Sequence, residues 1–189
     1  MTQRILRLIP SRSLLPFLAV LLCTGMPALA QNSGLELHAN DHASAEKIGL
    51  PSYPGATPYK APDNDATIDM GYSFGDSHFR LMVANFETSD AGAKVLDYYR
   101  KPLSRYGEVL ECEGDKPVGK LTTTRSGLTC SDEHSGNVQV NAHSDADGHE
   151  LRAGTPEKFR VVEIDKAEPN STRFALVYIE LPKDQAEKK

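Results

Sequence analysis

The chain has 189 residues, with 26 acidic and 21 basic side chains and a formal net charge of −5. This acidic balance argues against a nucleic-acid partner and against an anionic membrane surface, because both need clustered lysine and arginine. A chain of this length suits one domain with one sizeable core.

Residues 1–30 have the organisation of a cleavable secretory signal. Three arginines in the first dozen residues precede an apolar run over 14–23, and small residues follow at Ala28 and Ala30. This is the order of basic region, apolar core and cleavage site, and the run is shorter than the roughly 20 residues that span a bilayer. We expect cleavage near Ala30, no membrane span in the mature chain, and a soluble periplasmic or extracellular protein. Losing three arginines changes the net charge from −5 to −8.

The three cysteines have different expected fates. Cys23 lies in the signal and raises the alternative of a lipid-anchored protein, but that processing needs a small residue before the cysteine, where this chain has Leu22. Cys112 and Cys130 remain, and an even count in an exported chain predicts a disulfide. They lack the C-x-x-C spacing of a redox pair.

The mature chain divides by composition. Residues 31–48 are polar without a period and are expected to be a flexible leader. Residues 49–182 are expected to form a single domain, and the charged residues 183–189 a disordered tail. Within the domain, Tyr53-Pro54-Gly55-Ala56 matches a type II turn.

Period-two alternation predicts strands over most of the domain. Residues 67–74 and 78–86 are expected to form a β-hairpin. Further strands are expected at 109–112, 118–125, 128–131, 138–143, 159–164 and 174–181. The sequence therefore predicts an α+β fold with a mainly antiparallel sheet of about six to eight strands.

One principal helix is predicted over about 90–105, packed on one face of the sheet, from apolar side chains at helical spacing. Thr88 or Ser89 is expected to cap its start. Pro102 removes a helical hydrogen bond, so a bend or break is expected near Lys101. Gly107 is a natural stop.

Two motifs suggest chemistry but lack their partners. Ser44 and Lys47 match S-x-x-K, but the accompanying motifs of serine acyl-enzymes are absent. The run 145–148 is similar to part of a calcium loop, yet its alignment puts His143 at the first ligand and Gly154 at the twelfth, where carboxylates are needed. We assign no catalytic residue and no cofactor.

Three histidines are weak candidates for a metal site. His134, His143 and His149, with Asp132, could meet around adjacent turns and bind a transition metal. The alternative is that they are solvated turn residues.

Tyrosines carry much of the aromatic area, because the chain has seven of them and no tryptophan. Tyr53, Tyr59 and Tyr99 are candidates for a binding surface where the proline-rich segment meets the helix. The alternative is packing between the helix and the sheet.

Two segments carry a family resemblance. GLPSYPGA at 49–56 and KVLDYYRKPLSRYG at 94–107, with shorter stretches at 73–75 and 174–178, resemble a family of small bacterial exported proteins of unknown function. The resemblance covers about 49–182. It implies a bacterial envelope protein and no catalytic residues.

Three functions remain open from the sequence. The first, which we favour, is a non-enzymatic binding or interaction module of the cell envelope, whose partner is an unknown protein or small ligand. The second is a small hydrolase-like enzyme with an unrecognised site of histidine and aspartate. The third is a carrier of a small ligand or metal.

Overall fold

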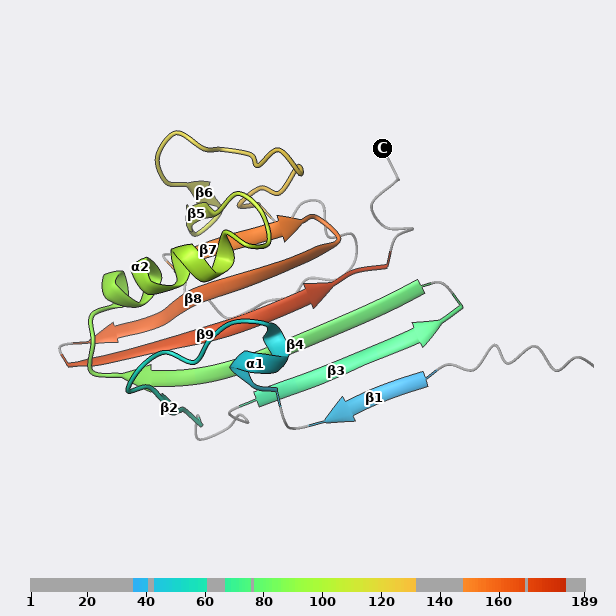
Figure 1. Ribbon diagram of the computed structural model, residues 1–189, viewed down its shortest axis with the longest axis horizontal. Helices are drawn as coiled ribbons and strands as arrows, with labels where there is room; N and C mark the ends of the chain where they lie inside the picture. Colours follow the sequence, from blue (N-terminus) through green and yellow to red (C-terminus); the bar gives the residue numbers. More distant parts are fainter. Residues whose placement is uncertain are drawn as a thin grey trace, which may run out of the picture. The chain divides into compact units, whose positions relative to one another are not determined.

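An antiparallel β-sheet organises the chain (Figure 1). The computed structural model describes residues 36–40, 43–60, 67–75, 77–131, 148–168 and 170–182. Their strands are β1 (Glu36–Asn40), β2 (Thr57–Pro58), β3 (Thr67–Phe74), β4 (Ser77–Thr88), β5 (Leu110–Glu113), β6 (Lys116–Pro117), β7 (His149–Thr155), β8 (Lys158–Glu168) and β9 (Ser171–Glu180). The strand order is β1-β3-β4-β9-β8-β7-β5-β6, and β2 pairs with β4. The predicted α+β class is confirmed.

Two helices, α1 (Ala45–Ile48) and α2 (Gly92–Leu103), cover one face of this sheet (Figure 1). The chain leaves β4, passes through α2 to β5 near the far edge, and returns through β7 and β8 to β9. β9 then pairs with β4, so it joins the N-terminal hairpin to the C-terminal strands. The helices and the inner strands share a core around Phe174, Leu176 and Val162.

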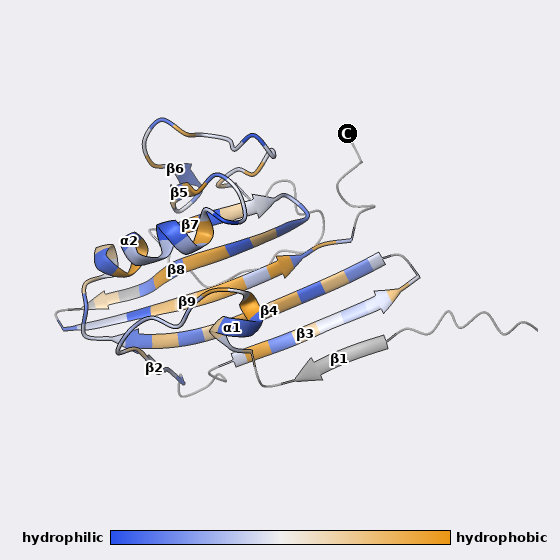
Figure 2. Ribbon diagram, in the orientation of Figure 1, coloured by the Kyte–Doolittle hydropathy of each residue, from blue (hydrophilic) through white to orange (hydrophobic). Residues whose placement is uncertain are grey.

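The central strands β8 and β9 are buried on both faces. Val162 and Leu176 face the helices, whereas Val161 and Val177 belong to a second buried cluster with Leu128. Strands buried on both sides carry continuous apolar runs, and Figure 2 shows such colouring along much of β9. This explains why 159–164 and 174–181 are the clearest strands in the sequence.

The predicted hairpin is confirmed as β3 and β4, which pair in register from Thr67↔Ala84 to Phe74↔Ser77. The strand expected at 109–112 is present as β5. The strands expected at 118–125 and 128–131 are wrong, because these residues form turns and irregular structure. Thr124 N donates to Leu128 O, and Leu128 N donates to Thr124 Oγ1, both at 3.0 Å. The strand expected at 138–143 lies outside the described residues.

Part of the expected leader belongs to the domain. Within 31–48, β1 pairs with β3 and α1 buries Ala45 and Ile48. The Ser44 hydroxyl accepts from Lys47 N at 3.3 Å, and Gly49 ends the helix with φ 88°. The S-x-x-K match is therefore a helix cap, a favoured role for serine. The predicted signal at 1–30 and tail at 183–189 lie outside the described residues.

The principal helix is confirmed, with two corrections. Its N-cap is Ala91, which makes no side-chain bond, while Thr88 Oγ1 accepts from Asp90 N before the helix starts. The expected break near Lys101 is wrong, because the helix continues to Leu103 with Pro102 in its last turn. Pro102 has no N–H to donate to the carbonyl of Tyr98, but Ser104 N donates to Arg100 O at 3.0 Å, so helical bonding resumes directly after it.

Candidate functional site

The two segments that carry the family resemblance lie against each other. Tyr98 donates to Ser52 O at 3.1 Å, and Tyr99 donates to Pro51 O at 3.0 Å. Tyr106 donates to Gly49 O at 2.5 Å. We call these three tyrosines, with residues 49–53, the tyrosine cluster. Its hydroxyls satisfy backbone carbonyls of an irregular segment, which would otherwise be costly to bury.

The tyrosines proposed as a binding surface are therefore mainly structural. Tyr53 is 5% exposed and Tyr99 is 0% exposed, so neither presents an open surface. Burial, together with the hydrogen bond to Asp90 at 2.8 Å, raises the pKa of Tyr53 to about 12. Tyr59 is half-buried, with the guanidinium carbon of Arg173 4.2 Å from its ring centroid.

Arg160 connects the tyrosine cluster to α1. Its Nε donates to Ile48 O at 2.7 Å, and its guanidinium lies 3.6 Å from the centroid of the Tyr106 ring. These contacts hold the end of α1 against β8. They also fix the position of Lys47, which belongs to the same helix.

Beyond α1 the same face of the sheet opens into a cavity of about 420 Å³, which we call the polar pocket. Arg80 and Met82 are two positions apart on β4, so Arg80 shares the face of Met82, which packs under the helices. The pocket is lined by Lys47, Asp69, Gly71, Tyr72, Ser73, His78, Phe79, Arg80 and Glu180. It combines residues from α1, β3, β4 and β9.

A buried carboxylate orients Arg80 in the pocket. Asp69 is 7% exposed and accepts from Arg80 Nε at 3.2 Å and Nη2 at 3.1 Å. Lys47 Nζ lies 3.9 Å from the same carboxylate. Arg80 itself is 49% exposed. A guanidinium has five N–H groups, so Asp69 fixes the plane of Arg80 and leaves three of them directed away from the ion pair.

Glu180 forms the negative side of the pocket. It accepts from Tyr178 OH and from Lys158 Nζ, the latter at 3.2 Å. Burial alone would raise the pKa of Glu180, but these hydrogen bonds outweigh burial and the pKa lies below its ordinary value. Glu180 is therefore ionised at neutral pH.

Ser73 and His78, cross-strand partners of β3 and β4, also line the pocket. His78 Nδ1 is 3.0 Å from Ser73 Oγ, a distance found between a nucleophile and its base. Within the described part of the chain, no carboxylate is hydrogen-bonded to the His78 ring. The pair therefore lacks the third group that orients the base in a catalytic triad.

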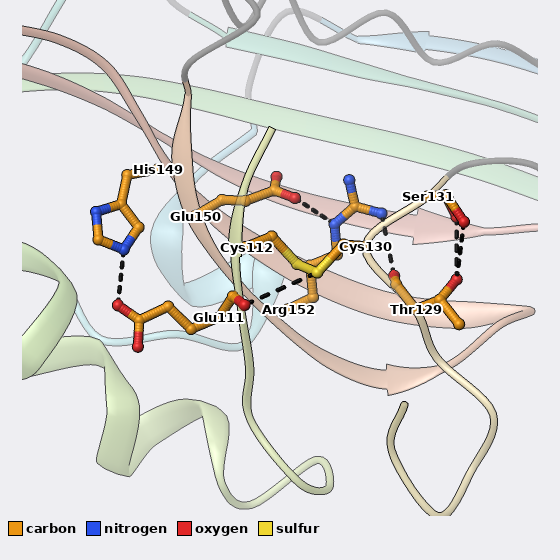
Figure 3. Close-up of a disulfide and its surroundings, with 8 residues drawn as sticks. All are labelled: Glu111, Cys112, Thr129, Cys130, Ser131, His149, Glu150 and Arg152. Carbon is orange, nitrogen blue, oxygen red and sulfur yellow. Dashed lines mark hydrogen bonds and ion pairs between the residues drawn. A yellow bond between two sulfur atoms is a disulfide. The ribbon is translucent and has the colours of Figure 1, made fainter. Parts of the chain in front are cut away.

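The predicted disulfide is confirmed at the other end of the sheet (Figure 3), where Cys112 of β5 bonds to Cys130. Both cysteines are buried with Leu110. Beside them, Arg152 forms an ion pair with Glu150. The bridge ties the segment after β6 back to the strand that precedes it.

The metal candidates are only partly within the described residues. His149 Nε2 lies 2.7 Å from Glu111 Oε1 (Figure 3), and Arg100 Nη2 lies 2.6 Å from Glu111 Oε2. Burial would raise the pKa of Glu111, but the hydrogen bonds from Arg100 and His149 outweigh it and the pKa lies below its ordinary value. His134 and His143 lie outside the described residues, as does the run 145–147. Among the residues that are described, no three possible metal ligands come together.

Sequence reasoning missed the polar pocket. Its residues come from positions 47, 69, 71–73, 78–80 and 180, and no short motif joins them. The one available signal was the alternation in β3 and β4, which places Asp69, Ser73 and Arg80 on the face opposite to Tyr72 and Leu81.

No family model, curated protein or solved structure matches the chain. The resemblance to small bacterial exported proteins therefore stays a prediction. In the described part of the chain, no helix has the length and apolar character needed to cross a membrane.

Proposed function

We propose that this chain is an exported protein of the bacterial cell envelope that binds a small polar ligand in the polar pocket. The observation that supports the proposal most is the pocket itself. It has a volume of about 420 Å³ and is lined by charged groups of both signs that are held by neighbouring side chains. Ligand sites typically have volumes of roughly 300–1,000 Å³ with a few fixed polar groups.

Binding is favoured over catalysis by the roles of the charged groups. Asp69 is engaged by Arg80, and Glu180 is engaged by Tyr178 and Lys158. Both carboxylates have the character of positioning groups, since neither is placed to move a proton to or from Ser73. Fixed charges reduce the entropy that binding costs.

Export is supported by the order of charges and apolar residues in the first 30 positions. The disulfide between Cys112 and Cys130 suits the same compartment, because structural disulfides persist in oxidising environments.

A ligand screen tests the pocket. The processed protein would be titrated by calorimetry with a library of small polar metabolites, using the wild type and Ser73→Trp. Tryptophan suits a strand, and at Ser73, which lines the pocket, its side chain would occupy the cavity. We expect binding by the wild type and at least tenfold weaker binding by Ser73→Trp. Thr57→Trp, at an exposed position of β2, is the matched control and should bind like the wild type. Binding that survives Ser73→Trp would place the ligand elsewhere.

Processing tests the export proposal separately. The full chain would be expressed in a Gram-negative host, and the N-terminus of the periplasmic protein would be sequenced. We expect it to begin at Gln31, after Ala30. An intact N-terminus in the cytoplasmic fraction would contradict export.

A further inference from the structure

The polar pocket separates two opposite charges that the sheet places side by side. Arg80 and Glu180 are directly opposite each other in the pairing of β4 with β9. Opposite charges at such positions lie within reach of each other and usually attract. Here they form no ion pair, because each is held by its other neighbour.

The two side chains turn apart across the sheet. Arg80 is held by Asp69 of β3, on one side of β4. Glu180 is held by Lys158 of β8, which is its cross-strand partner on the opposite side. Asp69 and Lys158 therefore keep the guanidinium and the carboxylate from neutralising each other. The pocket between them has one positive wall and one negative wall.

We infer that the ligand is a free α-amino acid, bound as its zwitterion; this inference rests on the proposed function of the polar pocket. The ligand carboxylate accepts from the outward N–H groups of Arg80, in the planar geometry that guanidinium and carboxylate share. The ligand ammonium donates to Glu180, which is 32% exposed. The hydroxyl of Ser73 lies at the same cavity.

Ligands with a single charge fit this pocket less well. An anion that binds Arg80 is repelled by Glu180, and a cation that binds Glu180 is repelled by Arg80. Each arrangement also leaves one wall charge without a partner in the ligand, which lowers the affinity for ligands with a single charge. A ligand that carries both charges on substituents of one carbon, as an α-amino acid does, can pair with both walls.

The test uses the processed protein and calorimetric titration with each of the twenty protein amino acids. For every amino acid that binds, two analogues follow: the carboxylic acid without the amino group and the amine without the carboxylate. We expect at least one amino acid to bind and both of its analogues to bind at least tenfold more weakly.

Two charge variants test which group of the ligand binds to Arg80 and which to Glu180. In Arg80→Gln the amino acid should lose at least tenfold in affinity and should bind no better than the amine analogue. In Glu180→Gln it should lose a similar factor and bind no better than the carboxylic acid analogue. Arg125→Gln and Glu113→Gln, exposed and outside the pocket, are the matched controls and should bind like the wild type. Thermal unfolding of each variant checks that it folds.

The outcomes separate the two proposals. If the carboxylic acid analogue binds as well as the amino acid and Glu180→Gln has no effect on affinity, the pocket is an anion site. The inference that it recognises a zwitterion is then wrong. If no amino acid binds but another polar metabolite does, and Ser73→Trp abolishes that binding, the amino-acid inference is wrong and the pocket is supported as a ligand site. If binding of an amino acid is unchanged in Arg80→Gln, Glu180→Gln and Ser73→Trp, both proposals fall.

Discussion

Gly154 lies where two paired strands, β7 and β8, leave no room for a side chain. Its φ is +137°, and a Cβ placed on it would collide with Lys158 O and with the Cα of Phe159. A Cβ on Gly107, which follows α2, would make only ordinary contact with the backbone of Gly154, at 3.6 Å, and the constraint at Gly107 is its φ of +148°. The clash at Gly154 falls within the β7–β8 hairpin, where Gly154 pairs with Phe159, so the absence of a side chain lets the two strands pair in this register.

Gly154→Ala should lower the free energy of unfolding by about 3 kcal/mol, since it combines an unfavourable φ with a steric clash. The matched control is Gly55→Ala, where φ is +77° but no atom lies within 4 Å of the added Cβ. This control should cost about 1 kcal/mol, from the backbone conformation alone. Urea unfolding measures both values. Equal losses in the two variants would contradict the close approach at Gly154.

Tyr99→Phe removes only the hydroxyl that donates to Pro51 O. Because Tyr99 is fully buried, the carbonyl is left without that donor and stability should fall by about 1 kcal/mol. Tyr98→Phe removes the similar bond to Ser52 O at an exposed position, where water can replace it, and should cost less. Chemical denaturation of the two variants gives the comparison. A larger loss in Tyr98→Phe would show that the tyrosine cluster is not held as described.

At the scale of elements, the disulfide fixes a segment with little regular structure. Residues 118–131 contain no strand, yet Leu128 packs under β8 and Cys130 is buried beside Leu110. Closing a loop with a separation of 18 positions stabilises by about 3 kcal/mol through the unfolded chain.

The double variant Cys112→Ala/Cys130→Ala should therefore unfold with a free energy about 3 kcal/mol lower than the wild type. A thiol titration of the denatured, unreduced mature protein should find no free thiol. Two reactive thiols, or no change in stability on removing both cysteines, would contradict a structural disulfide.

Sequence patterns predicted the elements whose periodicity matches their burial. α2 buries one face and β9 buries both, so the spacing of their apolar residues matches their burial. The β3–β4 hairpin was also predicted, although in β3 the buried side chain is Asp69, while Met70 and Phe74 of the apolar set are exposed. β7 was missed because Glu150 and Arg152 are buried as an ion pair, which gives the strand a polar sequence. α1 was missed because only Ala45 and Ile48 anchor it.

The polar pocket could not be predicted for a different reason. It depends on the register of β9 against β4, which brings Glu180 opposite Arg80 across 100 positions of sequence. Register between distant strands is set by the complete core, and no local pattern encodes it. The tyrosines were visible in the sequence, but their burial depends on where Pro51 and Ser52 dock.

For the whole molecule, two carboxylates link folding to pH. Glu111 and Glu180 both have pKa values below their ordinary range in the folded state, because their hydrogen bonds to cations and tyrosine outweigh burial. A group of this kind stabilises the fold above its unfolded pKa, near 4.3. The contribution is lost as the pH falls through the folded pKa.

Stability measured by urea unfolding should therefore fall between about pH 5 and pH 3. Glu111→Gln should be less stable than the wild type at pH 7 and should lose less on acidification. Glu113→Gln, an exposed glutamate on the same strand, should follow the wild type. If stability fell with pH to the same extent in Glu111→Gln and in the wild type, Glu111 would not contribute to the pH dependence of folding.

The central claim is that the polar pocket on the open part of the helix-covered face is the binding site. The most direct measurement is a titration of the ¹⁵N-labelled processed protein with an amino acid or other polar metabolite that binds, followed by amide chemical shifts. We predict that the largest shifts fall on Gly71, Ser73, Arg80 and Glu180, with little change around Cys112 and Cys130. Largest shifts around the disulfide, with those four amides unmoved, would contradict it.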